Sequence, residues 1–153
     1  MLRISALINK KRVSFSTTDA KNIKNLGMYA HILELKDNIV EIAITSDYLI
    51  VATEPPELRG RSYAPLVIQD RPQNNINAYD WRGNHKWNIA EIVGDIKYSF
   101  YGGSVTTAEL LAGDVDPSIL NDDHEYYFCV SHNDQKYIID LTEKRLIKKV
   151  QTK

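Results

Sequence analysis

Hydrophobic and polar residues alternate in short runs along most of the chain, which is the period expected of β-strands. Residues 12–18 alternate well, and residues 2–8 alternate in part. Only the polar stretch Asn9-Lys10-Lys11 separates these two runs. The pattern therefore predicts an antiparallel hairpin at the N-terminus.

Three further runs follow between His31 and Glu54, and each is rich in Ile, Val and Tyr, which suit a pleated sheet. Asp37-Asn38 and Ser46-Asp47 supply the turns between them. The Gly102-Gly103 pair is expected to stop a later strand. Later runs of the same character predict strands over residues 75–81, 85–93, 95–103, 124–131, 135–141 and 145–151.

Helical signals are few and short. Residues 20–26 follow a capping Asp19 and precede Gly27, and residues 106–113 open with a capping box of Thr106 and Glu109. Asp116 before Pro117 predicts one further helical turn. None of these segments is long enough for a parallel crossover, so the chain is predicted to be all-β, or β-rich with two or three short helices.

The stretch "NINAYDWRGNHKW" at residues 75–87 combines a strand end, a glycine-containing turn and a returning strand. It resembles the blade repeat of quinoprotein-type and WD-like β-propellers, in which an aspartate closes an inner strand and a tryptophan begins the outer one. Residues 137–147 repeat the plan, although Glu143 stands where the turn glycine would be. The positions that carry the resemblance are Ala78, Tyr79, Asp80, Gly83 and Trp87, and then Asp140 and Ile147.

The resemblance implies two antiparallel, four-stranded, blade-like units at residues 39–94 and 95–151. Residues 1–38 would add the hairpin and a short helix, all within a single domain of residues 1–153. A closed propeller needs four or more blades, and 153 residues cannot supply them. A two-sheet sandwich, a partial propeller and closure by oligomerisation remain open.

The composition excludes some classes of function but does not identify a particular function. Hydrophobic residues make up 43% and charged residues 25%, as in ordinary globular domains. The net charge of −1 gives no overall attraction to nucleic acid or to an anionic membrane. A lone cysteine, Cys129, excludes an internal disulfide, and the charged N-terminus does not resemble a signal peptide, so we expect a cytoplasmic protein.

Residues 55–73 hold four of the five prolines and are expected to form a long binding loop. Four of the seven arginines lie between residues 59 and 82. Guanidinium groups suit phosphate or carboxylate, and nearby aromatic rings could stack. Surface ion pairs with Glu54, Glu57, Asp70 and Asp80 are the plainer alternative. The candidate binding residues are Arg59, Arg61, Tyr63, Arg71, Trp81 and Arg82.

Candidate catalytic and metal-binding residues are sparse. Asp80, His85 and Ser104 are the residue types of a hydrolytic triad, but Ser104 lacks the G-x-S-x-G setting. His124 near Asp122 and Asp123, and His132 near Asp134, match no metal-binding spacing. We therefore expect no catalytic residues, no metal and no cofactor, and we expect Cys129 to be a buried small hydrophobe.

These observations predict a non-catalytic domain that binds a protein partner or copies of itself, with no nucleic acid or membrane as partner. A small anionic ligand is possible at the arginines. One alternative is an oligomeric, propeller-like carbohydrate-binding protein, in which Trp81, Trp87 and the strand tyrosines stack on sugars. Another is a toxin-neutralising immunity protein.

Overall fold

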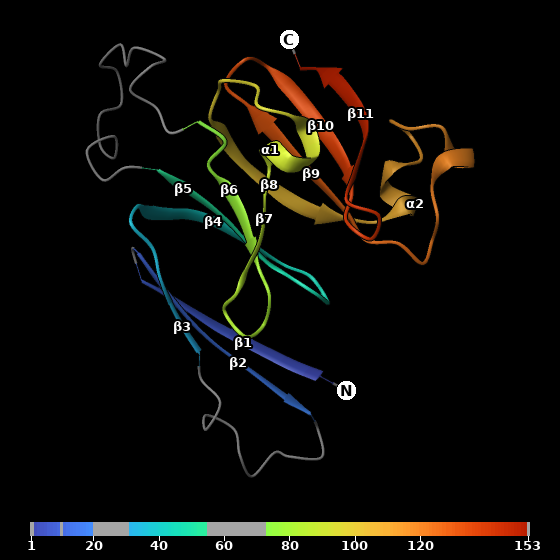
Figure 1. Cartoon of the computed structure of the whole chain (residues 1–153). Helices are drawn as coiled ribbons and strands as arrows, with labels where there is room; N and C mark the ends of the chain where they lie inside the picture. Colours follow the sequence, from blue (N-terminus) through green and yellow to red (C-terminus); the bar gives the residue numbers. More distant parts are fainter. Residues whose placement is uncertain (1, 10, 20–30, 55–72, 153) are drawn as a thin grey trace.

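A computed structural model describes residues 2–9, 11–19, 31–54 and 73–152, and these residues form three stacked antiparallel sheets (Figure 1). The predicted helix at residues 20–26 lies outside the described residues, as do residues 55–72. The N-terminal sheet consists of β1 (Leu2–Asn9), β2 (Arg12–Asp19) and β3 (His31–Glu34). The middle sheet consists of β4 (Asn38–Ile44), β5 (Leu49–Glu54), β6 (Ile76–Tyr79) and β7 (His85–Asn88). The C-terminal sheet consists of β8 (Phe100–Thr106), β9 (Tyr126–Ser131), β10 (Gln135–Asp140) and β11 (Arg145–Gln151).

The predicted fold class is confirmed: the chain is β-rich, with two antiparallel four-stranded sheets and short helices. Each four-stranded sheet joins strands in sequence order, β4-β5-β6-β7 and β8-β9-β10-β11. The described strands do not close into a barrel. The predicted N-terminal hairpin is also present, and β3 pairs with β2 to complete a three-stranded sheet.

The main core lies between the two four-stranded sheets. The middle sheet contributes Ile50, Ala78 and Trp87, and the C-terminal sheet contributes Tyr137 and Ile139. Burying a large apolar side chain contributes about 1.5–3 kcal/mol, so this layer is the chief source of stability. No helix among the described residues is long and apolar enough to cross a membrane.

A second apolar layer joins the N-terminal and middle sheets. Val13 packs there with Ile39, Leu49 and Val51. Residues 49–52 are apolar without alternation because Leu49 and Val51 face this layer while Ile50 and Ala52 face the main core. A strand covered on both faces loses the polar positions of a half-exposed one.

Asn75 ties the two four-stranded sheets together by hydrogen bonds. Its side chain accepts from the Phe100 backbone N–H at 2.6 Å, and it donates to the carbonyl oxygens of Phe100 at 3.1 Å and Thr53 at 2.7 Å. Asn75 is 5% exposed, so these backbone groups would have no ready access to water without it. The start of β8 is thereby fixed against the middle sheet.

The two four-stranded sheets share irregularities as well as strand order. In each sheet the pairing of the first two strands shifts register near its start, at Ile39/Glu41 and at Phe100/Gly102. In each, the third strand shifts against the fourth just before its closing aspartate, at Ala78/Tyr79 and Ile138/Ile139. The two four-stranded sheets are therefore alike in detail.

Three local predictions were wrong. Residues 85–93 do not form one strand, because β7 ends at Asn88 and helix α1 (Ala90–Val93) follows. The Asn88 side chain accepts from the Ala90 N–H at 2.9 Å, and Ile89, Ile92 and Val93 pack on the core at helical spacing. The capping residue of helix α2 (Ala108–Leu111) is Thr107, whose hydroxyl accepts from the Leu110 N–H, and Thr106 belongs to β8.

The glycine pair does not stop a strand, because β8 runs through Gly102 and Gly103 to Thr106. A Cβ on Gly102 would collide with the Glu41 side chain of β4. A Cβ on Gly103 would collide with the Tyr127 ring and would lie 2.6 Å from the Phe128 carbonyl oxygen. The glycines therefore let β8 approach its neighbours closely.

Gly103→Ala is expected to lower the free energy of unfolding by about 1–3 kcal/mol, the usual cost of overpacking, because the backbone of β9 cannot move aside cheaply. Gly113→Ala is the matched control, since a Cβ there meets nothing within 4 Å, and its effect should stay within about 0.5 kcal/mol. Urea unfolding of both variants measures the difference. Equal stabilities would contradict the close packing of β8 on β9.

Asn75→Ala should lower the free energy of unfolding by about 2 kcal/mol, because it leaves buried backbone groups of Phe100 and Thr53 unpaired. Gln135 lies five residues before Asp140, as Asn75 lies five before Asp80, but its side chain bonds only to exposed Gln151 among the described residues. Gln135→Ala should therefore change stability by less than about 0.5 kcal/mol. A similar loss in both variants would argue against the bridging role of Asn75.

Candidate functional site

The connection from β8 to β9 forms a compact projection that we call the cap segment, residues 107–123. It contains α2 and the 3₁₀ turn η4 (Pro117–Ile119). Thr107 caps α2, and the Asp116 carboxylate accepts from the Ser118 N–H at 3.0 Å, as the sequence predicted for one helical turn. The Tyr126 hydroxyl accepts from the Asn121 N–H at 2.8 Å. Local hydrogen bonds therefore shape this connection.

The inner side of the cap segment covers the outer face of the C-terminal sheet. Ala108, Leu111 and Val115 pack on Tyr126 and Ile138. The cover is incomplete, and apolar side chains at its margin stay partly exposed. These are Leu120, Phe128, Ile147 and Val150.

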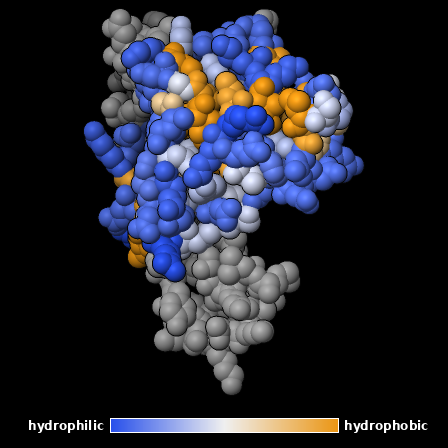
Figure 2. Space-filling model, turned by 45° about the vertical axis from the view of Figure 1, so that its right-hand side comes forward, coloured by the Kyte–Doolittle hydropathy of each residue, from blue (hydrophilic) through white to orange (hydrophobic). Residues whose placement is uncertain are grey.

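The outer side of the cap segment presents apolar side chains to solvent. Leu110 is 72% exposed and Ile119 is 50% exposed. Figure 2 shows hydrophobic residues gathered in a band over the upper half of this side of the molecule, with hydrophilic residues around it. Exposed apolar side chains grouped on one segment are a feature of contact surfaces.

A hollow of about 640 Å³ opens between α2 and η4. Its walls combine apolar groups with two carboxylates, and no cationic side chain lines it. The lining residues are Thr107, Ala108, Glu109, Ala112, Pro117, Leu120 and Asp122.

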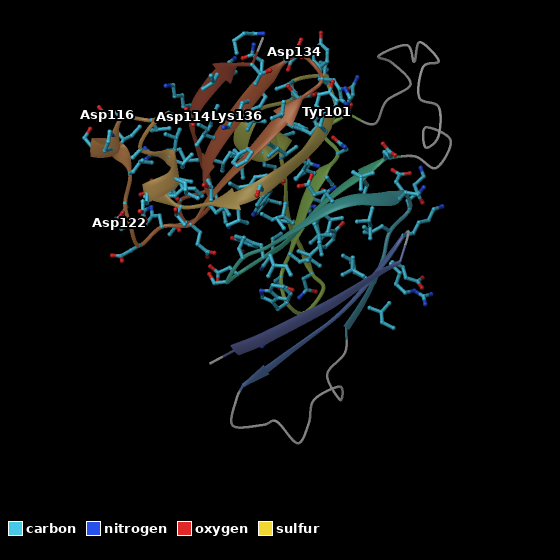
Figure 3. The ribbon with its side chains drawn as sticks, turned by 180° about the vertical axis from the view of Figure 1, so that it is seen from behind. Tyr101, Asp114, Asp116, Asp122, Asp134 and Lys136 are labelled. Carbon is cyan, nitrogen blue, oxygen red and sulfur yellow. The ribbon has the colours of Figure 1, made fainter. Side chains whose placement is uncertain are left out.

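The cap segment and the two residues after it are strongly acidic. Residues 107–125 contain six carboxylates and no lysine or arginine. Asp114 lies 3.9 Å from the Lys136 ammonium, and its carbonyl oxygen accepts from Lys148. Figure 3 shows Asp114 near Lys136, with Asp116 and Asp122 at the outer end of the segment. Within the described part of the chain, no ion pair engages Glu109, Asp122 or Asp123.

The hydrogen bond from the Ser118 backbone, assisted by the Ser118 side chain, lowers the pKa of Asp116 from its ordinary value of 3.8. This carboxyl group is therefore ionised at neutral pH, and it adds to the negative charge at the outer end of the cap segment.

Two of the six predicted binding residues are described. Trp81 is half-buried against the second apolar layer, and its indole N–H donates to the Ser46 carbonyl oxygen at 3.2 Å. Arg82 is exposed in the β6–β7 turn. Trp81 thus has a packing role. Anion binding by Arg82 stays a prediction. Arg59, Arg61, Tyr63 and Arg71 lie outside the described residues.

The structure does not bring together Asp80, His85 and Ser104, the three residues with the side-chain types of a hydrolytic triad. The Asp80 carboxylate accepts from the backbone N–H groups of Arg82 and Asn84, each at 2.9 Å. The His85 ring bonds to the Asn77 side chain, and the Ser104 hydroxyl donates to the Val105 carbonyl oxygen in the other four-stranded sheet. Each group therefore has a separate structural partner.

A histidine and two carboxylates meet where β10 turns into β11. Donor atoms of His124, Asp140 and Glu143 lie within 4.8 Å of one another. The buried Asp140 carboxylate bonds to His124 Nδ1 at 2.7 Å and accepts from the Glu143 N–H at 3.0 Å. These groups could hold a metal ion, but the three side chains are already engaged, by the hydrogen bond between His124 and Asp140 and by the ion pair between Glu143 and Arg145. The sequence suggested Asp122 and Asp123 as companions of His124, and it missed Asp140 and Glu143.

Cys129 and five of the eleven aromatic side chains that the structure describes are buried. Burial raises the pKa of the Cys129 thiol well above its ordinary value, so the thiol is an unreactive core group, as predicted. Trp87, Tyr126, Tyr127 and Tyr137 are each at most 2% exposed. Tyr101 differs, at 57% exposed, and it lies against the His132 ring.

No protein-family model matches the chain, and a comparison with curated proteins finds no significant match.

Asp140→Ala should destabilise the fold more than Asp80→Ala, although the two aspartates occupy matching turns. Asp140 is 2% exposed and bonded to His124, so its loss should cost about 2–3 kcal/mol. The Asp80 side chain is 22% exposed, and its loss should cost about 1 kcal/mol. Urea unfolding at neutral pH measures both, and a larger loss for Asp80→Ala would contradict this order.

The Asp80 carboxylate should make stability depend on pH. Partial desolvation raises its pKa, but hydrogen bonds from Asn84 and Arg82 and the charge of Lys86 outweigh this, so the pKa falls below its ordinary value of 3.8. The folded state then binds the proton less tightly than the unfolded state. The stabilisation is complete above the unfolded pKa and is lost as pH falls through the lowered folded pKa.

The stability gap between the wild type and Asp80→Asn, measured by urea unfolding, should therefore shrink as pH falls below about 5 and through the lowered pKa of Asp80. Asp47→Asn, at an exposed turn position, is the control. A gap for Asp80→Asn that stays constant with pH would rule out the ionised carboxylate as the stabilising form.

Proposed function

We propose that this chain is a non-catalytic protein-binding domain, and that the outer side of the cap segment is its contact surface. One observation carries the proposal: Leu110 and Ile119 project into solvent from a segment whose other side is well packed. Placing such side chains in water is unfavourable, and a partner that covers them recovers the free energy of burial.

The surroundings of these residues support the proposal. The centre of a protein interface is usually apolar and its rim is polar. The cap segment offers Leu110 and Ile119 together with Glu109, Asp116 and Asp122. The main core of the two four-stranded sheets gives this surface a rigid support, so binding would not require the fold to rearrange.

The shared strand order and register shifts of the two four-stranded sheets support a common blade-like ancestry, which we propose for them. In the carbohydrate-binding alternative, aromatic rings must reach solvent to stack on sugars. Trp87 and three of the strand tyrosines are buried, which favours a protein partner over a sugar. A toxin-neutralising role would be one form of the proposed function, and the single buried thiol suits the reducing cytoplasm.

Replacing both Leu110 and Ile119 by serine should abolish capture of the partner when the tagged chain is purified from its native cells. Ile32→Ser with Ile44→Ser is the matched control, since these residues are also exposed, at 62% and 43%, but lie on the N-terminal and middle sheets. Quantitative mass spectrometry compares the captured proteins. Thermal unfolding checks that both double variants stay folded.

Loss of one captured protein with Leu110→Ser/Ile119→Ser, and its retention with Ile32→Ser/Ile44→Ser, would support the cap segment as the contact surface. Retention of every captured protein by the folded Leu110→Ser/Ile119→Ser variant would refute it.

A further inference from the structure

We propose that the hollow between α2 and η4 receives a lysine or arginine side chain from a basic, amphipathic segment of the partner protein. This inference rests on the proposed function and adds the chemistry of the partner to it.

The lining of the hollow matches the two parts of such a side chain. Ala108, Ala112, Pro117 and Leu120 provide apolar walls. Lysine and arginine carry a methylene stem that packs on apolar surface while the charged head stays in a polar setting. Glu109 and Asp122, on the same walls, supply carboxylates for that head.

The charge distribution selects a cation over an anion. Residues 107–125 hold six of the 20 acidic residues, and all 19 lysines and arginines lie elsewhere in the chain. Two cations that reach the cap segment, Lys136 and Lys148, are engaged with Asp114. Glu109 and Asp122 have no ion-pair partner among the described residues, so a positive group from outside would meet uncompensated carboxylates.

The exposed apolar residues of the cap segment, which also contains the hollow, indicate that the partner segment is amphipathic rather than simply basic. Leu110 precedes Ala112 in the same projection, and Ile119 precedes Leu120. A short helix with leucines on one side and lysines along its margins would cover both and also place a cation at the hollow. This is a common mode of helix recognition by grooved surfaces.

The test uses the full chain and two synthetic peptides of about 18 residues, long enough to form an amphipathic helix. One peptide is built from leucine and lysine, and the other has glutamate in place of every lysine. Amide chemical shifts in ¹⁵N-labelled protein locate the binding, and calorimetry gives the affinity at low and high salt. The leucine–lysine peptide should bind, shift residues 107–123, and weaken as salt rises, while the glutamate peptide should not bind.

Glu109→Gln combined with Asp122→Asn should weaken binding of the leucine–lysine peptide at least about tenfold. The control is Asp37→Asn with Asp47→Asn, which removes the same charge from turns of the N-terminal half and should leave the affinity within about twofold. Equal affinities for both double variants would overturn the proposal. So would amide shifts centred outside residues 107–123, or the absence of saturable binding.

Other outcomes separate this inference from the proposed function. If the glutamate peptide binds the cap segment as well as the lysine peptide does, the cationic partner is refuted, while a protein-contact surface stands. If sedimentation shows wild-type self-association that Glu109→Gln/Asp122→Asn removes, the occupant is a second copy of the chain and the proposal of a separate basic partner fails. If Leu110→Ser/Ile119→Ser captures every partner, the proposed function itself fails.

Discussion

The apolar contact between the two four-stranded sheets supports every other feature of the molecule. A single four-stranded antiparallel sheet has two faces, and neither sheet here could exist alone with both in water. Ile50, Ala78 and Trp87 from one sheet meet Tyr137 and Ile139 from the other, and together they exclude water from the main core. Asn75 then fixes how the sheets meet, because its amide bonds both backbone groups of Phe100 at the point where the second sheet begins.

Much of the fold could be predicted because its signals are local. Alternation and turn residues located most of the strands, and the matching Asp80 and Asp140 motifs in the sequence predicted the two similar four-stranded sheets. The error over residues 85–93 was avoidable, since Ile89, Ile92 and Val93 have helical spacing and Asn88 is a good capping residue. The error at Gly102 and Gly103 could not be avoided from the sequence. Glycine is needed there because a Cβ would collide with the Glu41 side chain and the Tyr127 ring, which lie on other strands.

The candidate site was harder to predict than the fold. The sequence pattern predicted a binding site at the arginines of residues 59–82. It predicted only short helices over residues 106–120. The sequence does show that residues 107–125 contain six carboxylates and no lysine or arginine. This charge pattern could have indicated a binding surface. The exposure of Leu110 was not visible, because Leu110 and Leu111 are adjacent and identical in type, and only packing on Tyr126 and Ile138 distinguishes the buried one.

The position of the cap segment has a consequence for how the protein remains a discrete particle. A stack of sheets that pack through apolar faces leaves an apolar face at its end, and an uncovered face of this kind can pair with the same face of a second molecule. Ala108, Leu111 and Val115 occupy that face at one end of the stack. The cap segment thus covers much of the face through which two copies of the chain could otherwise pair sheet to sheet.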